Sequence, residues 1–257
     1  MRIYGICIDS YDNETKQLKQ RPEVSLVMDY YPYSLDIFFP PKKRKRKKRG
    51  PQVVQDDISS GQTEFWSREL VLRCAQHIAS GMAFIHAKDM IHRDLKPANC
   101  LLTKDMNQIV VADFGLSKIA RDKESVTGQL GTPAYMASEM INVRLDPSEA
   151  GANLPACDVF SYGVLINALW GRERPYENLR ISAFDLLLQV GEGRRPAMKD
   201  DLPMQMRELL ERCWAHVPDQ RPAFREIAEI LQRDDFRQDF FGGGDGSGAG
   251  GAQGQEF

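Results

Sequence analysis

The most informative segment of the chain is Ile91-His92-Arg93-Asp94-Leu95-Lys96-Pro97-Ala98-Asn99-Cys100-Leu101-Leu102. A strand-like apolar start leads into three polar residues, Asp94, Lys96 and Asn99, spaced two and three residues apart. Pro97 breaks the segment, because proline cannot continue a regular helix and has no backbone N–H to donate. The three side chains can therefore converge from one loop, where they place a carboxylate, a cation and an amide near one point.

A second motif, Asp113-Phe114-Gly115, begins fourteen residues after Asn99. Phosphoryl transfer needs such groups, because the protein mainly positions the reactants and neutralises charge on the moving phosphoryl group. Taken alone, Asp94 and Asp113 can also be loop-capping carboxylates, and Lys96 a solvated surface charge. Two motifs in this order and at this spacing favour the chemical interpretation.

The two motifs resemble the catalytic loop and the metal-binding turn of protein kinases. The resemblance implies that Asp94 orients the substrate hydroxyl and accepts its proton, while Lys96 offsets charge on the γ-phosphate of ATP. It also implies that Asn99 and Asp113 hold Mg²⁺, a cation that prefers oxygen ligands. Lys96 at this position is similar to the serine/threonine kinases rather than the tyrosine kinases.

Upstream, residues 1–31 have the pattern of two strands. Isoleucines at positions 3, 6 and 8 are followed by a polar turn from Asp9 to Pro22 and then by the β-prone run at 24–28. Alone, this is a generic hairpin. Beside the downstream motifs it is similar to the fourth and fifth strands of a kinase small lobe, followed by a short helix over residues 34–39.

The same resemblance implies where ATP is held. Met28 corresponds to the gatekeeper position, and Asp29-Tyr30-Tyr31 to the hinge whose backbone meets adenine. The residues expected to contact ATP are Met28, Asp29, Tyr31, Leu101 and Lys96.

Residues 1–257 contain no match to the front half of a kinase small lobe. That half supplies a Gly-rich loop over the phosphates, a strand Lys and a helix Glu. Met1 falls inside what resembles the strand after that helix, so these parts are expected to be missing. Lys16 and Lys19 lie in the expected hairpin turn, and the G-x-G-x-x-G match at 246–251 follows no strand.

Residues 40–62 interrupt the kinase pattern and are expected to form a flexible insertion. Residues 42–49 are eight consecutive basic side chains, from Lys42 to Arg49, which repel one another. The run is similar to a nuclear localisation signal, which makes a nuclear import receptor an expected partner, and a solvated insertion is the equally weighted alternative. Nucleic acid is less favoured, since no aromatic residue lies within the run to stack a base.

The composition is that of an ordinary globular chain, long enough for one large domain or two lobes. Eight of its 34 basic residues lie at 42–49, so the remainder has 26 basic and 36 acidic side chains and a net charge of −10. We find no apolar run long enough for a membrane span or a secretory signal, which predicts a cytoplasmic protein, with the nucleus as the alternative. The five cysteines are scattered, so free thiols are expected.

From residue 63 the apolar period becomes that of a helix, which is expected to end near residues 86–89 and to lead into Ile91. His77 and His86 are expected to be packing or surface histidines. A nearly wholly apolar helix is expected from Asp158 to Trp170, with others around 181–190, 204–214 and 224–231. We expect Asp158 to cap its helix and, by resemblance, to steady the backbone around His92 and Arg93.

The segment from Asp113 to Glu139 is an activation-loop candidate. Ser125 or Thr127 is the hypothesised phosphorylation site, with Arg93 placed to meet the added charge, and ordinary loop hydroxyls are the alternative. Residues 131–139 are similar to the substrate-docking end, although the family's Ala-Pro-Glu is here Ala-Ser-Glu. Glu139 is expected to form a buried ion pair with Arg221.

These features predict an α+β protein kinase-like fold with an incomplete β small lobe and a complete, mainly α large lobe. The expected segments are a partial small lobe and hinge over 1–39, the basic insertion over 40–62, the large lobe over 63–241 and a disordered Gly-rich tail over 242–257. The resemblance is to serine/threonine kinases of the tyrosine-kinase-like branch, which use ATP and Mg²⁺ on protein substrates. Activity is expected to be impaired by the missing parts, and the alternative is a catalytically weak binding module or decoy.

Overall fold

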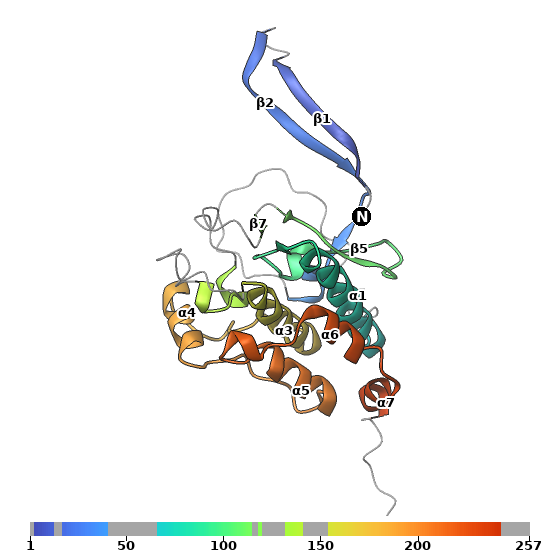
Figure 1. Cartoon of the computed structure of the whole chain (residues 1–257), viewed down its shortest axis with the longest axis vertical. Coiled ribbons are helices and arrows are strands. Elements are labelled where there is room, and N and C mark those ends of the chain that lie inside the picture. Colours follow the sequence, from blue (N-terminus) through green and yellow to red (C-terminus); the bar gives the residue numbers. More distant parts are fainter. Residues whose placement is uncertain are drawn as a thin grey trace, which may run out of the picture.

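The computed structural model of the chain describes residues 3–12, 17–40, 66–114, 118–119, 132–140 and 154–242. Helices form one body, and a two-stranded hairpin extends away from it (Figure 1). Several predicted features lie outside the described residues, namely the basic run at 42–49, Gly115, Ser125, Thr127 and the tail from residue 243. The mixture of short strands and several helices confirms the α+β class, while the predicted segment boundaries stay predictions.

The hairpin consists of β1, Ile3–Asp12, and β2, Gln17–Met28, which pair antiparallel. The polar turn predicted from Asp9 to Pro22 is wrong, because the strands extend into it and Lys19 lies in β2. The pairing shifts register where Asp9 faces Glu23 and Tyr11 faces Leu18, so β2 bulges around Pro22. A bulge accommodates proline, which cannot donate a hydrogen bond to the ladder.

The segment from residue 91 to residue 102 begins in one small sheet and ends in another. The sheet at its end has the order β3-β5-β6 and consists of β3, Tyr33–Ser34, β5, Cys100–Leu102, and β6, Ile109–Val111. The sheet at its start pairs β4, Met90–Ile91, with β7, Lys118–Ile119, a strand that the sequence pattern does not predict. Between β4 and β5 the chain forms an open loop and the 3₁₀ turn η2, Pro97–Asn99. A strand at each end therefore holds the loop that carries Asp94.

The helical body confirms the predicted large lobe. It is built around α3, Ala156–Gly171, in which every residue from Ala156 to Trp170 is buried. Helices α1 and α5 pack against α3, and α6 packs against α1 (Figure 1). The other helices and 3₁₀ turns are α1 (Arg68–His86), α4 (Ala183–Gly191), α5 (Met204–Cys213), α6 (Phe224–Ile230), η1 (Leu35–Phe38), η5 (Pro133–Tyr135) and η7 (Pro218–Gln220). None of the helices in the described part is both long and apolar enough to cross a membrane.

The start of α1 differs from the helix predicted from residue 63. Ser67 is the N-cap, and its side chain accepts a hydrogen bond from Leu70 N at 3.1 Å, so the helix begins at Arg68. Trp66 lies before the cap, and its indole N–H donates to Leu169 O at 3.2 Å. The apolar period alone cannot separate Trp66 from the helix, because a tryptophan anchored on α3 has the same spacing as a helical one.

A last helix, α7, Asp234–Gly242, is not predicted from the sequence and contains Gly242, which the pattern assigns to the tail. Phe236 and Phe240 are fully buried, and the ring of Phe240 meets Trp170 edge-on at 5.6 Å. Asp234 and Asp235 in the first turn suit the positive end of the helix dipole. The helix is therefore stabilised mainly by tertiary packing, against α5 and against Trp170 of α3.

Two helical glycines provide a matched test of how closely α3 and α5 pack. A Cβ at Gly163 would lie 2.9 Å from Cys213 Cβ, whereas a Cβ at Gly81 on α1 would meet nothing nearer than Val111 Cγ2 at 3.8 Å. We expect Gly163→Ala to lower the free energy of unfolding by about 1–3 kcal/mol, through overpacking. Gly81→Ala should raise it by about 0.5–1 kcal/mol, since alanine favours a helix. Urea denaturation followed by circular dichroism measures both, and a stabilising Gly163→Ala would contradict the close packing.

Candidate active site

The carboxylate of Asp94 is the centre of the site, and protein groups bind both of its oxygens. Lys96 Nζ donates to Oδ2, and Asn99 Nδ2 donates to Oδ2 at 3.1 Å and to the Asp94 backbone oxygen at 2.8 Å. On the other side, the backbone N–H of Thr132 donates to Oδ1 at 3.0 Å. Asp94 is only 8% exposed and Asn99 5%. The structure thus brings together Asp94, Lys96 and Asn99, as the sequence predicts.

Thr132 is a site residue that the sequence analysis does not single out. Besides its backbone N–H, its hydroxyl lies 3.3 Å from Asp94 Oδ1. The residue opens η5, in the segment that resembles a substrate-docking region. The sequence does contain a signal for this residue, namely the resemblance and a hydroxyl residue directly before Pro133. It cannot show which distant carboxylate the hydroxyl contacts.

His92 joins the loop to the strand end that carries Asp113. Its Nε2 lies 3.0 Å from Ala112 O, and its Nδ1 accepts a hydrogen bond from Asp94 N at 3.3 Å. A carbonyl oxygen only accepts, so the proton of this fully buried ring is on Nε2. Phe114 lies against the same ring, with the ring centroids 5.2 Å apart. The imidazole therefore connects the loop of Asp94 to the end of β6, with one ring nitrogen bonded to each.

Asn99 and Asp113 lie at adjacent ends of β5 and β6. These strands pair Cys100 with Val111, and Ala112 N donates to Asn99 O at 2.8 Å. Because Asn99 uses its Nδ2 on Asp94, its Oδ1 is the side-chain atom left to face a cation. Asp113 is exposed and follows Ala112 directly. Amide and carboxylate oxygens are ligands that suit Mg²⁺, so the donor set fits the predicted metal site.

Asp158 on α3 fixes the backbone of the loop. Its carboxylate accepts hydrogen bonds from His92 N at 2.8 Å and from Arg93 N at 2.7 Å. This confirms the predicted steadying role. The predicted capping role is wrong, because Pro155 is the N-cap of α3 and Asp158 already lies within the first turn. Its acceptor oxygens turn away from its own helix toward the loop.

His86 is a further member of this network that the sequence analysis interprets only as a packing or surface residue. Its Nε2 lies 2.9 Å from Asp158 Oδ2, and its ring meets Phe224 edge-on at 5.0 Å. Opposite a carboxylate oxygen, this nitrogen must be the donor. His86 is the last residue of α1, so the contact joins α1, α3 and the loop. We class His86 as a positioning residue, since it acts through Asp158.

Three of the residues predicted to contact ATP lie where β2 ends and the chain continues to β3. Met28, the last residue of β2, is half-buried, and so are Asp29 and Tyr31 in the link between β2 and β3. Strand β3 then pairs with β5 so that Ser34 faces Leu101. Burial, with help from the charge of Asp29, raises the pKa of Tyr31, so its hydroxyl stays protonated. The sheet brings this link close to the strand that follows Asn99, while the adenine contacts themselves stay a prediction.

The predicted ion pair between Glu139 and Arg221 is confirmed. Arg221 Nη1 donates to Glu139 Oε1, and Nη2 donates to Oε2 at 3.2 Å, so the contact is bidentate. The Arg221 side chain is 1% exposed and also donates to the backbone oxygens of Ala156 and Ala215. This pair fastens the segment after Thr132 to α3 and to the loop before α6.

Comparisons with known proteins identify the family to which the chain is similar. A family model described as protein tyrosine and serine/threonine kinase matches residues 4–231. The chain is 38% identical over 173 residues to dual specificity protein kinase shkB of Dictyostelium discoideum, covering 65% of this chain and 25% of that protein. It is 34% identical over 164 residues to human mitogen-activated protein kinase kinase kinase 7, covering 62% and 25%.

A third relative is a probable LIM domain-containing serine/threonine-protein kinase of Dictyostelium discoideum. The identity is 33% over 162 residues, which are 63% of this chain and 23% of the relative. The chain thus spans about a quarter of the length of these curated relatives.

Removing one partner of the buried ion pair tests its structural role. We expect Arg221→Met to lower the free energy of unfolding by about 3–5 kcal/mol, since it leaves Glu139 without its partner and also removes two bonds to backbone oxygens. The matched control is Arg225→Met, where the pair with Glu229 is largely exposed and the loss should stay below about 1 kcal/mol. Chemical denaturation measures both variants, and equal losses would show that the pair is not a structural anchor.

Proposed function

Because this chain belongs to the protein tyrosine and serine/threonine kinase family, we propose that it transfers the γ-phosphate of ATP to serine or threonine hydroxyls of protein substrates. The observation that carries the proposal is the Asp94 carboxylate, held on both oxygens by Lys96, Asn99 and Thr132. A carboxylate fixed in this way is ready to orient a hydroxyl group and needs little rearrangement as the reaction proceeds. The lysine two residues after Asp94 supports the choice of serine or threonine over tyrosine.

In the proposed reaction, the substrate hydroxyl gives its proton to Asp94 as its oxygen bonds to the γ-phosphorus. The bond between that phosphorus and the bridging oxygen breaks, and ADP leaves with the electron pair. Lys96 is placed beside Asp94 to offset negative charge on the transferred group. Asp94 contributes mainly by orientation, because the transition state of phosphoryl transfer is loose and asks little covalent work of the protein.

Asn99 and Asp113 are the residues that would hold Mg²⁺. When bound, the metal neutralises charge on the β- and γ-phosphates. The residues themselves are kept in place by the protein, since Ala112 bonds through its N–H to Asn99 and through its oxygen to His92. ATP contacts are assigned to Met28, Asp29, Tyr31, Leu101 and Lys96, on the basis of the resemblance and of the β3–β5 pairing.

A catalytically weak binding module is the alternative function. It is favoured by one feature of the sequence, since residues 1–257 contain neither a strand-borne Gly-rich phosphate loop nor the lysine that normally follows it. Loss of one charge-stabilising donor typically costs on the order of 10²–10³ in rate. Under this alternative the chain retains a docking surface for proteins but turns over slowly.

Carboxamide variants at the two acidic positions test catalysis. We expect Asp94→Asn to lower the rate of phosphorylation of a general protein substrate by roughly 10²–10⁴-fold, because an amide cannot accept the proton. Asp113→Asn should weaken Mg²⁺-dependent ATP binding and turnover. The matched control, Asp200→Asn, changes an exposed carboxylate outside the site and should leave the rate unchanged.

The measurement is transfer of labelled phosphate from ATP, with ATP binding followed separately by calorimetry. Equal transfer by the unaltered chain and by Asp113→Asn would rule out catalysis by this chain. ATP binding without transfer above the Asp94→Asn level would support the binding module instead.

We also propose that residues 42–49 direct the protein to the nucleus by binding an import receptor, and that it otherwise remains in the cytoplasm. Eight adjacent cations present a dense charge for an acidic receptor groove. Replacing the run with serine and glycine in a fluorescent fusion is expected to shift the protein from nucleus to cytoplasm. As a control for charge alone, Arg225, Arg233 and Arg237 are changed to glutamine. Unchanged localisation of the first variant would reject the proposal.

A further inference from the structure

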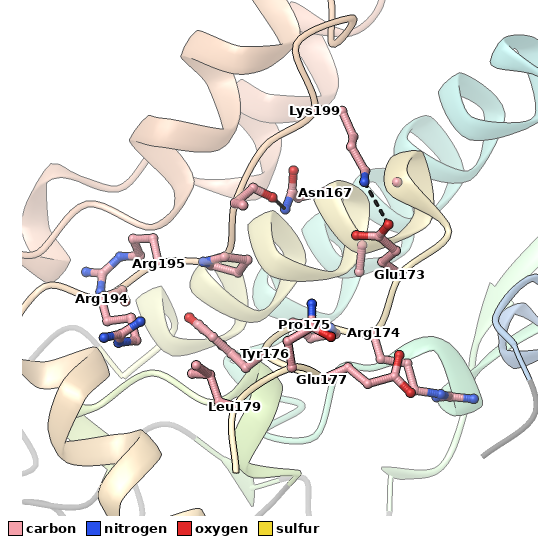
Figure 2. Close-up of a pocket in the computed structure, with 15 residues that line it drawn as sticks. Asn167, Glu173, Arg174, Pro175, Tyr176, Glu177, Leu179, Arg194, Arg195 and Lys199 are labelled. Carbon is pink, nitrogen blue, oxygen red and sulfur yellow. Dashed lines mark hydrogen bonds and ion pairs between the residues drawn. The ribbon is translucent and has the colours of Figure 1, made fainter. Parts of the chain in front are cut away.

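A pocket of about 260 Å³ lies beside the C-terminal end of α3, apart from Asp94 and its partners. Its walls come from the end of α3, the loop after that helix and the segment that follows α4 (Figure 2). The polar lining residues that matter here are Glu173, Arg174, Tyr176, Arg194, Arg195 and Lys199. No step of the proposed phosphoryl transfer uses this pocket.

Two hydrogen-bond donors of the pocket are buried without an acceptor among the described residues. They are the hydroxyl of Tyr176 and Nε of Arg174. The other end of Arg174 is engaged, since Nη1 lies 3.0 Å from Asp36 Oδ1 and the guanidinium covers the ring of Phe39. Buried polar groups in folded proteins nearly always have a partner, so the Tyr176 hydroxyl indicates a place for an acceptor. The Arg174 side chain points away from Tyr176 (Figure 2), so its Nε does not share that place.

Two guanidinium groups lie on the Tyr176 side of the pocket. Arg195 is rigid, because it donates to Trp214 O and Val190 O at 2.8 Å each and lies over the ring of Phe160. Its neighbour Arg194 is exposed, and among the residues that the structure describes its side chain has no ion pair or hydrogen bond, only its backbone oxygen accepting from Arg195. One preorganised cation and one free cation thus stand next to an unused hydroxyl.

The two acidic residues of the lining lie on the other side. Figure 2 shows Glu173 and Glu177 across the pocket from Arg194 and Arg195. Glu173 is also paired with Lys199 at 2.7 Å. Four basic residues against two acidic ones leave the lining with a net charge of +2, concentrated around Tyr176.

Tyr176 is kept as a donor by its surroundings. Burial raises the pKa of its hydroxyl to about 12, although Arg195 and Arg194 pull it down. The phenol is therefore protonated at neutral pH. Its backbone is left-handed, with φ 61°, a conformation that is costly in a residue other than glycine and persists only where other contacts impose it.

We propose that this pocket binds the phosphate group of a phosphorylated side chain on a partner protein. A phosphate monoester offers three acceptor oxygens, which match the Tyr176 hydroxyl and the guanidinium of Arg194. A protein is favoured over a free anion because apolar side chains continue from the pocket. Ile181, Phe184 and Leu188 are 38%, 59% and 47% exposed, and Ile181 lies two residues after Leu179 of the lining.

The test uses the chain of residues 1–257 and a fluorescein-labelled peptide with one phosphoserine between two leucines. Fluorescence anisotropy is expected to show binding that the unphosphorylated peptide lacks. Arg194→Ala should weaken it about tenfold, since a charge-assisted hydrogen bond is lost. The matched control, Arg225→Ala, removes an exposed arginine on α6 and should have no effect.

Tyr176→Phe provides a second, independent variant. Because the hydroxyl has no partner among the described residues, its removal should leave the melting temperature unchanged or raised while weakening phosphopeptide binding severalfold. A lowered melting temperature with unchanged binding would overturn the assignment of Tyr176.

Three outcomes would overturn the proposal as a whole. They are equal binding of both peptides, equal weakening by Arg225→Ala, and competition by inorganic phosphate as strong as that by the phosphopeptide, which would indicate a site for a free anion. The assay contains no ATP, so its result is independent of whether the chain is a catalyst.

Discussion

Asp158 has no exposed surface, yet its carboxylate receives hydrogen bonds from the backbones of His92 and Arg93 and from the ring of His86. A buried carboxylate is costly unless donors surround it, and two of these donors belong to the loop that leads into Asp94. The loop therefore has little freedom to leave α3. Since α3 is buried on nearly all sides, the position of the Asp94 carboxylate is set from the centre of the helical body.

The same hydrogen bonds account for two unusual backbone conformations near His92, one at the next residue in the loop and one at the end of β6. Arg93 and Asp113 both have left-handed conformations, with φ 68° and 63°. Such conformations cost about 1–3 kcal/mol each in residues other than glycine, so tertiary contacts must impose them. The bonds of Asp158 do so for the loop, and the His92–Ala112 contact does so at the end of β6.

Much of this arrangement could be predicted from the sequence. The rest could not, and the reasons can be given residue by residue. Short-range spacing is sufficient to predict the meeting of Asp94, Lys96 and Asn99, and a family motif predicts the Glu139–Arg221 pair. Thr132, His86 and α7 escape prediction because their partners are distant in sequence: Asp94 for Thr132, Asp158 for His86 and Trp170 for α7. The bulge at Pro22 is missed because a proline in a polar run has the pattern of a turn.

The hydrogen bond between Thr132 N and the Asp94 carboxylate links two parts of the site. Thr132 begins the segment that the Glu139–Arg221 pair attaches to the helical body, so the position of this segment and the hydrogen bonding of the Asp94 carboxylate are directly coupled. A shift of the segment would remove a donor from one oxygen of that carboxylate. In the proposed reaction, the orientation of Asp94 and the placement of the protein substrate would therefore change together.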